Sequence, residues 1–448
     1  MDSLPSDALL NIISRVPTES VLECKLVCKK WLTLIRESGT YFTNLHFRHL
    51  INHLYGSGND GNNIATKALE SLFFACRRDE LDGPTWLFHG QKISDKISAN
   101  EKYSYKENLR KVNHPPMHNE LYDHFVGSCD GLICVSMHHD RVIDPIYMFN
   151  PITREYIYLP ELVVAPSPDM ERPFITEEGE VDLLGCVSSG FGCVRSTNEY
   201  KIVRIHFPCT VYEGHVEVYT LGSGRGWRFK GVTAIRLMKP NGAGIFANGS
   251  LYWTGDNNIV AFDLASEDFR LIPYPPCMIN CVRNIDIYGL VALGGNLCFY
   301  LEKVRLQIWS LKKRSNENSD IEDIWCLDFD IGFEGVAVDR EWTWFTPVLL
   351  TEAREVILIY NDSALYSYDS KTTTLKMISD DDEVSKEYFA NVKAISHVHS
   401  FASLEAMGEK SKRYSVGDIW ECKIAIEQLE TTSLVWGGTT AQKTNTPN

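Results

Sequence analysis

The feature that most constrains the fold is a unit of short strands that recurs along the chain. From about residue 120, runs rich in Ile, Val, Tyr, Phe and Trp alternate with Gly, Asn, Asp, Ser and Pro, a pattern typical of strands joined by tight turns. Clear copies of the unit cover 130–160, 248–273 and 356–379, and less regular copies cover 200–232 and 296–313. A unit of this kind cannot bury both of its faces alone, so it must stack on further copies.

The spacing of the units indicates how they are assembled. Each unit has an aromatic residue just before a turn, and these markers are Phe149, Tyr219, Phe262, Trp309 and Tyr368. The last three intervals are 43, 47 and 59 residues, which fit the ~40 to 50 of kelch and WD-type propeller blades if some units carry insertions. The first interval, of 70, has room for a further blade. We therefore predict a large all-β domain of β-propeller-like (kelch-like) architecture, with a β-sandwich as the alternative.

The first 35 residues have a helical period instead. Pro5 and Asp7 suit a helix start, and apolar residues recur at three- and four-residue spacing up to Val16. Pro17 ends this helix, and a second apolar series covers 21–35. About 45 residues bury too little surface to be stable alone, and helices apolar on more than one side need a partner. Either the following domain or another protein can be that partner.

The segment LPSDALLNIISRVPTESVLECKLVCKKWLTLI (4–35) resembles an F-box, with Leu-Pro, an acidic residue two positions later, a Leu/Ile helix ending in Arg-Val-Pro, and a second helix carrying Val-Cys-Lys-x-Trp. F-box helices bind a Skp-type adaptor, which links the protein to a cullin scaffold. The resemblance implies an all-α F-box whose adaptor-binding residues are Leu4, Pro5, Asp7, Leu10, Ile13, Val16, Pro17, Leu22, Val27, Cys28 and Trp31.

The β-rich part resembles the F-box-associated domain of the large plant F-box families. The matching phrases follow in the family's order: VGSCDGLICV, MFNPITREYIYLP, SGFGCVRSTNEYKIVRI, VEVYTLGSGRGWR, ANGSLYWTG, IVAFDLASEDFRLIPYPP and LQIWSLKK. This resemblance implies the substrate-recognition subunit of an SCF-type ubiquitin ligase, not itself an enzyme, whose β domain captures an unknown protein target for ubiquitination. Two alternatives stay open, a ligand-sensing or lectin-like binding module and a propeller enzyme.

We expect four segments along the chain. These are an F-box domain over 1–48, a linker with possible first-blade strands over 49–120, the propeller-like domain over 121–407 and a partly disordered tail over 408–448. ALESLFFAC (68–76) is the candidate strand of the first blade.

Charge and composition exclude some partners. The net charge is −15, and because the first 50 residues hold six Lys or Arg against five Asp or Glu, the acidic excess lies in the body. This argues against nucleic acid, whose binding rests on Lys and Arg. We find no signal peptide and no ~18-residue apolar stretch that would span a membrane, and most of the 13 cysteines lie in hydrophobic runs, which suits reduced thiols. We expect a cytoplasmic and/or nuclear protein.

Candidate chemical motifs are weak. GSGRGW (222–227) imitates a phosphate loop, but neither Lys-Ser/Thr nor a helix follows it, so we interpret it as a hairpin turn. HHD (138–140) with His206 or His215 has the residue types of an iron triad, but it lies in a turn after a strand. The pairs Cys24 with Cys28 and Cys277 with Cys281 lack a second pair at zinc-ligand spacing. We therefore expect no catalytic, cofactor-binding or metal-binding residues.

Overall fold

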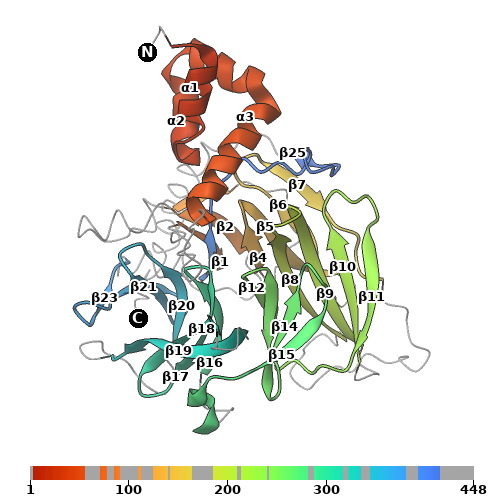
Figure 1. Ribbon diagram of the computed structural model, residues 1–448, viewed down its shortest axis with the longest axis vertical. Coiled ribbons are helices and arrows are strands. Elements are labelled where there is room, and N and C mark those ends of the chain that lie inside the picture. The colour runs from red at the N-terminus through yellow and green to blue at the C-terminus, as the bar shows by residue number, and fades with distance from the viewer. Residues whose placement is uncertain are drawn as a thin grey trace, which may run out of the picture.

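A computed structural model shows a small helical part on top of a large all-β body (Figure 1). This agrees with the fold class expected from the sequence. None of the helices in the described part of the chain is long and apolar enough to cross a membrane. The structure describes residues 4–55, 71–77, 85–90, 109–112, 125–139, 142–163, 185–208, 213–239, 242–280, 287–315, 321–333, 344–379 and 392–413.

Three helices form the N-terminal part. Helix α1 (Ser6–Ile13) starts after Pro5 and has Asp7 in its first turn, and α2 (Thr18–Val27) starts after Pro17. Each proline has the φ near −60° that suits a helix entry. Helix α3 (Lys29–Tyr55) is kinked where Gly39 has φ +41° and ψ −119°, a conformation that glycine adopts without a Cβ penalty.

Five antiparallel units follow one another along the body. In each of them consecutive strands pair, as expected where tight turns join short strands. A parallel pairing between β8 and β12 merges two units into one eight-stranded sheet, and the 3-10 helix η1 (Pro276–Asn280) follows β15. The units are β4 (Phe125–Cys129), β5 (Leu132–His139), β6 (Val142–Phe149) and β7 (Glu155–Tyr158), extended by β25 (Lys412–Arg413); β8 (Gly185–Val194), β9 (Glu199–Pro208), β10 (Gly214–Thr220) and β11 (Trp227–Thr233); β12 (Ala243–Ala247), β13 (Ser250–Thr254), β14 (Asn258–Asp263) and β15 (Phe269–Pro273); β16 (Ile287–Leu293), β17 (Asn296–Glu302), β18 (Leu306–Ser315) and β19 (Ile321–Ile331); and β20 (Phe345–Leu350), β21 (Glu355–Tyr360), β22 (Ala364–Asp369) and β23 (Thr374–Met377).

A sixth unit joins the two ends of the body. Its order is β24 (Lys393–His397), β1 (Ser71–Arg77), β2 (Thr85–Gly90) and β3 (Leu109–Lys111). The first strands of the units, β4, β8, β12, β16, β20 and β24, contact one another in that order, and β24 also contacts β4. The ring is therefore closed, which is the geometry of a propeller and not of a two-sheet sandwich.

The core of the body lies between neighbouring units. Of the five marker aromatics, Phe149, Tyr219, Phe262 and Tyr368 are buried, each in a different cluster, and Trp309 is half-buried. Phe73 of β1 packs against Phe149, with ring centroids 5.9 Å apart. The burial of apolar side chains between neighbouring units stabilises the ring.

The sixth unit does not lie where the sequence suggested room for it. The described part of the 70-residue interval holds strands β7 to β10, which belong to two neighbouring units, and residues 164–184 lie outside the described residues. The sixth unit instead combines Ser71–Arg77, which overlaps the 68–76 candidate strand, with Lys393–His397. Of the 408–448 segment, residues 412 and 413 pair with β7, and 414–448 lie outside the described residues.

Candidate functional site

The helices share an inner core that includes some of the adaptor-binding residues expected from the sequence. Leu10 and Ile13 are 5% and 2% exposed, and Val16 and Trp31 are half-buried against the same core. These four side chains hold the helices together. The other buried members of this core are Leu9, Val21, Ile35, Phe42 and, from the far end of the chain, Phe401.

The remaining expected residues lie at the surface. Pro5, Asp7, Pro17 and Cys28 are exposed, and Leu4 is half-buried. Two further members are the large apolar side chains Leu22, 37% exposed, and Val27, 64% exposed. The structure thus divides the expected set into an inner group and an outer group.

Two exposed apolar side chains join the outer group although they were not among the expected residues. Leu26 is 86% exposed and Ile12 is 49% exposed. Leu26 lies four residues after Leu22, so both occupy one face of α2. Because α2 has apolar residues on all sides, its sequence does not show which of them face inward. We call Ile12, Leu22, Leu26 and Val27 the exposed apolar set.

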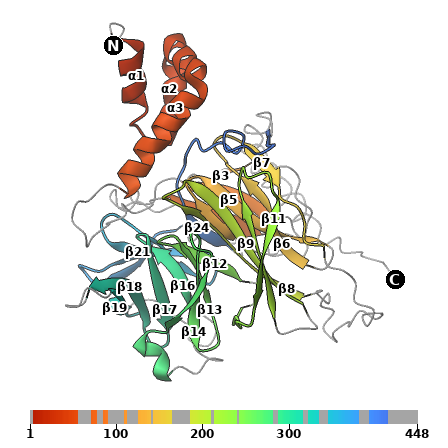
Figure 2. The same cartoon turned by 45° about the vertical axis from the view of Figure 1, so that its right-hand side comes forward.

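A segment that follows β24 fixes the helices to the propeller. We call residues 398–409 the connecting segment. The Thr18 hydroxyl donates to the carbonyl of His399 at 2.6 Å. The Phe401 ring lies 6.3 Å from the Phe42 ring and 5.1 Å from the His46 ring, measured between centroids. The helices therefore pack on a segment that continues directly from the ring-closing strand (Figure 2).

Asn150, in the turn between β6 and β7, binds the connecting segment from the propeller side. Its side-chain amide donates to the carbonyls of Ser400 at 3.1 Å and Ala402 at 2.7 Å. Its Oδ1 accepts from the Ile152 amide at 2.8 Å, and Ile152 packs against the helical core. One buried side chain thus joins the propeller, the connecting segment and the turn beneath the helices.

The first residue of β7 and the β4–β5 turn contact the same segment. Glu155 accepts from the Ser403 hydroxyl at 2.9 Å and from the Glu405 amide at 3.2 Å. In the β4–β5 turn Gly131 has φ +90°, and a Cβ there would lie 2.2 Å from the Ser400 Oγ. Only glycine fits this turn while the segment is in place.

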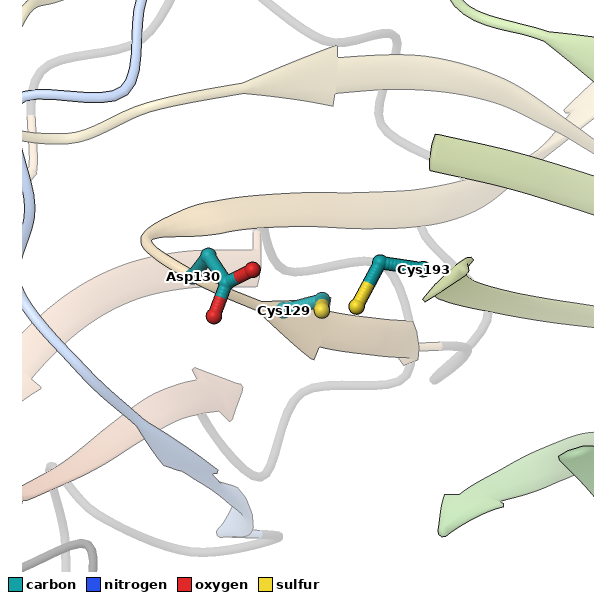
Figure 3. Close-up of side chains that lie close together, drawn as sticks. All are labelled: Cys129, Asp130 and Cys193. Carbon is teal, nitrogen blue, oxygen red and sulfur yellow. The ribbon is translucent and has the colours of Figure 1, made fainter. Parts of the chain in front are cut away.

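Cys129, Asp130 and Cys193 form a buried cluster between two units (Figure 3). Among the described residues this is the one group of three metal-type ligands, and the ligand atoms lie within 4.8 Å of one another. The Asp130 carboxylate accepts two N–H bonds from Arg195, one at 2.8 Å, and the Tyr200 hydroxyl at 2.9 Å.

The charges at this cluster favour a structural role. A hydrogen bond with Cys193, burial and the charge of Asp130 raise the pKa of the Cys129 thiol, whereas metal binding requires a thiolate. The Arg195 guanidinium already supplies the positive charge that Asp130 needs. We interpret the cluster as the buried anchor of an ion pair, in which the buried Asp130 of the β4–β5 turn binds the exposed Arg195 of the β8–β9 turn.

The other sequence candidates lie apart. GSGRGW joins β10 to β11, so its interpretation as a hairpin turn is confirmed. His206 and His215 face each other across β9 and β10, with ring centroids 6.3 Å apart, and Asp140 lies outside the described residues. Cys24 is half-buried, and Cys281 lies outside the described residues.

Comparison with known proteins agrees with this arrangement. Residues 71–380 match the family model described as "F-box associated beta propeller domain", and residues 1–43 match "F-box domain". F-box protein At3g07870 of Arabidopsis thaliana is 26% identical over 422 residues, covering 84% of this chain and 87% of that protein. F-box/kelch-repeat protein At3g23880 of the same plant is 22% identical, covering 81% and 88%, and F-box protein CPR1 is 23% identical, covering 84% and 85%.

Likeness to solved structures is weaker. A DUF4784 family protein from Bacteroides caccae superimposes with a TM-score of 0.34 at 9% identity, covering 73% of this chain and 74% of that one. Such a score carries no argument about fold or function.

Proposed function

This chain belongs to the F-box proteins that carry an F-box associated β-propeller domain, and on that premise we propose that it is the substrate-recognition subunit of an SCF-type ubiquitin ligase. The helices bind a Skp-type adaptor, and through it a cullin scaffold, while the propeller holds a protein target. The chain performs no reaction itself. It raises the effective concentration of target lysines near the transfer site.

The observation that supports this proposal is the exposed apolar set. The inner faces of α1 to α3 already pack on one another and on Phe401, so Ile12, Leu22, Leu26 and Val27 have no further role within the helical core. Large apolar side chains exposed next to one another on a helix mark interaction surfaces. An adaptor that covers them removes apolar area from water, which favours binding by about 25 cal/mol per Å².

The connecting segment supports the second half of the proposal. The helices contact His399 and Phe401 of the connecting segment, and Asn150 of the propeller binds Ser400 and Ala402 between and beside them. The helices therefore have a defined position on the ring. A target bound by the propeller is then held at a defined distance from the adaptor. A short, rigid connection of this kind gives the target a high effective concentration at the adaptor-bound ligase.

The test is the affinity of the full chain for a Skp-type adaptor, measured by isothermal titration calorimetry. Leu26→Glu with Val27→Glu places two charges on the exposed apolar set without touching the inner core. We expect Kd to rise at least about 30-fold, since loss of a central apolar contact costs roughly 2 kcal/mol or more. Ile13 is a poor target for substitution because it is buried and its truncation opens a cavity.

The matched control is Leu327→Glu, a charge placed at an apolar side chain of β19 that is 43% exposed. We expect this variant to bind the adaptor as the unmodified chain does. Equal affinity of the double variant and the control, with unchanged circular dichroism for both, would contradict the proposal.

A further inference from the structure

A polar pocket of about 380 Å³ lies where the β8–β11 unit meets the β14–β15 turn of the next unit. Its lining includes Lys201 of β9, Ser223 and Arg225 of the β10–β11 turn, Arg228 of β11 and Glu267 of the β14–β15 turn. The volume lies within the range of small ligand sites, and the lining comes from two units of the ring.

Most of the charges in this pocket are already paired. The Glu267 carboxylate accepts from Lys201 Nζ at 3.0 Å and from Arg228 Nη2 at 2.6 Å. Lys201 Nζ also lies 3.9 Å from a carboxylate oxygen of Glu199 and donates to the Leu264 carbonyl at 2.8 Å. Burial opposes the ionisation of Glu267, but its hydrogen bonds with Arg228 and Lys201 outweigh it and lower the pKa.

Arg225 is the one cation of this lining for which the described residues supply no ion-pair partner. Among the described residues its guanidinium makes no ion pair, while Lys201 and Arg228 both pair with Glu267. With Glu199 as the second acid, the pocket carries three cations against two carboxylates. A local positive excess in a chain of net charge −15 attracts anionic groups and disfavours cations.

The turn that carries Arg225 is held in one conformation. Gly222, Gly224 and Gly226 have φ of 71°, 66° and 69°, which residues with a side chain rarely adopt. The Gly222 amide donates to Glu409 of the connecting segment at 2.7 Å. A Cβ at Gly222 would lie 1.7 Å from the Met407 carbonyl oxygen. The connecting segment therefore fixes the turn as well as the helices, and the two lie at the same end of the ring (Figures 1 and 2).

We propose that this pocket binds an anionic side chain of the target protein, phosphorylated or carboxylate, and that Arg225 is the residue that pairs with it. The proposal rests on the proposed function, because it names the chemistry by which the propeller recognises a target. A planar guanidinium pairs with either anion through two N–H groups. Ser223 adds a hydroxyl to the lining, and the site lies at the end of the ring that carries the helices.

The test uses the full chain and three short peptides, acetyl-Gly-Gly-X-Gly-Gly-amide, in which X is phosphoserine, glutamate or serine. Phenylglyoxal modification of Arg225, followed by mass spectrometry, reports occupancy at this residue, and modification of the exposed Arg36 of α3 is the internal control. We expect the phosphoserine or the glutamate peptide to protect Arg225 and not Arg36, and the serine peptide to protect neither. Protection by phosphoserine alone identifies a phosphorylated target, and protection by both anions identifies an acidic one.

Substitutions make the test specific. Affinity for the protecting peptide is measured by calorimetry, and Arg225→Ala is expected to weaken it at least tenfold. Lys230→Ala, which removes an equal charge from an exposed position on β11 just after the turn, is expected to leave it unchanged. Equal weakening by both substitutions, or no protection by either anionic peptide, would overturn the proposal. The Leu26→Glu, Val27→Glu chain separates the two proposals, because it loses the adaptor and keeps the peptide.

Discussion

The side chain of Asn150 makes hydrogen bonds both to the backbone of the connecting segment and to the backbone of its own turn. Its amide nitrogen donates to two carbonyls and its oxygen accepts from two amides, those of Ile152 and Thr153. The MFNPITREYIYLP phrase marked this turn as a family feature, but the partners lie about 250 residues away in the chain. The sequence shows the turn and does not show what it binds.

Replacing Asn150 by Asp tests this role. The carboxylate still accepts from Ile152, but it faces the carbonyls of Ser400 and Ala402 with no proton to donate. We expect the free energy of unfolding to fall by at least about 2 kcal/mol, the usual cost of a buried group left without its partner. Urea denaturation measures it, with the exposed Asn44→Asp of α3 as control. An equal urea midpoint for both variants would show that these bonds are not needed.

Glu302 gives a pH dependence of defined sign. Its carboxylate, at the end of β17, accepts from the Phe345 amide of the next unit at 2.7 Å. Burial raises its pKa to about 7, although that hydrogen bond lowers it. The native state then binds a proton more tightly than the unfolded state, whose carboxyl titrates near 4.5. Its contribution to stability is full below pH 4.5 and is lost as the pH rises to about 7.

The Glu302→Gln variant keeps the acceptor and lacks the titration. We expect it to lose less stability than the unmodified chain between pH 5 and pH 8 in urea denaturation. Burial lowers the pKa of His397, so the contribution of His397 to stability falls as the pH drops, opposite to that of Glu302. Because His397 is present in both chains, its effect cancels when the two are compared. The exposed Glu352→Gln is the control. A pH profile that Glu302→Gln does not change would refute the assignment.

At the scale of elements, the helical unit and the propeller are joined mainly through the connecting segment. Phe401 belongs to the helical core, yet it lies outside both family matches, which end at residues 43 and 380. Sequence periodicity predicts the two parts separately because each has its own repeat. It does not predict the join, since Phe401 has no periodic neighbours that mark it as part of a helical core.

Phe401→Ala tests the join. The substitution removes a ring that is 8% exposed and contacts Phe42 and His46, so we expect the helical unit to lose about 3 kcal/mol of stability. Amide hydrogen exchange of α1 to α3 measures this, and exchange should accelerate there while the strands of the ring stay protected. Phe229→Ala on β11, where the ring is 59% exposed, is the control. Unchanged exchange in the helices would mean that Phe401 does not hold them.

The division of the F-box residues into a buried inner group and an exposed outer group also depends on how the helices pack. The motif predicted that residues from Leu4 to Trp31 form a binding surface, and the structure places Leu10 and Ile13 inside and Leu22 and Val27 outside. Spacing alone cannot separate these groups, because the inner face depends on how α3 and Phe401 pack against α1 and α2. Leu26 was left out of the expected set for the same reason.

At the scale of the whole molecule, ring closure and helix attachment use one continuous stretch of chain. Strand β24 pairs with β1, and the connecting segment that follows it carries the helices. The five units predicted from repeats are contiguous in sequence, whereas the sixth pairs β1 with β24 across more than 300 residues and leaves no repeat signal. Closure is therefore visible only in the folded chain, where β24 also contacts β4.

The proposed adaptor-binding role of the helices is tested most directly by hydrogen–deuterium exchange of the full chain with and without a Skp-type adaptor. We expect slower exchange in residues 4–28, around Ile12, Leu22, Leu26 and Val27, and unchanged exchange in strands β8 to β23. Protection confined to the propeller strands, or no protection anywhere at saturating adaptor, would contradict it, because the helices would then be a cap on the ring and not its link to the ligase.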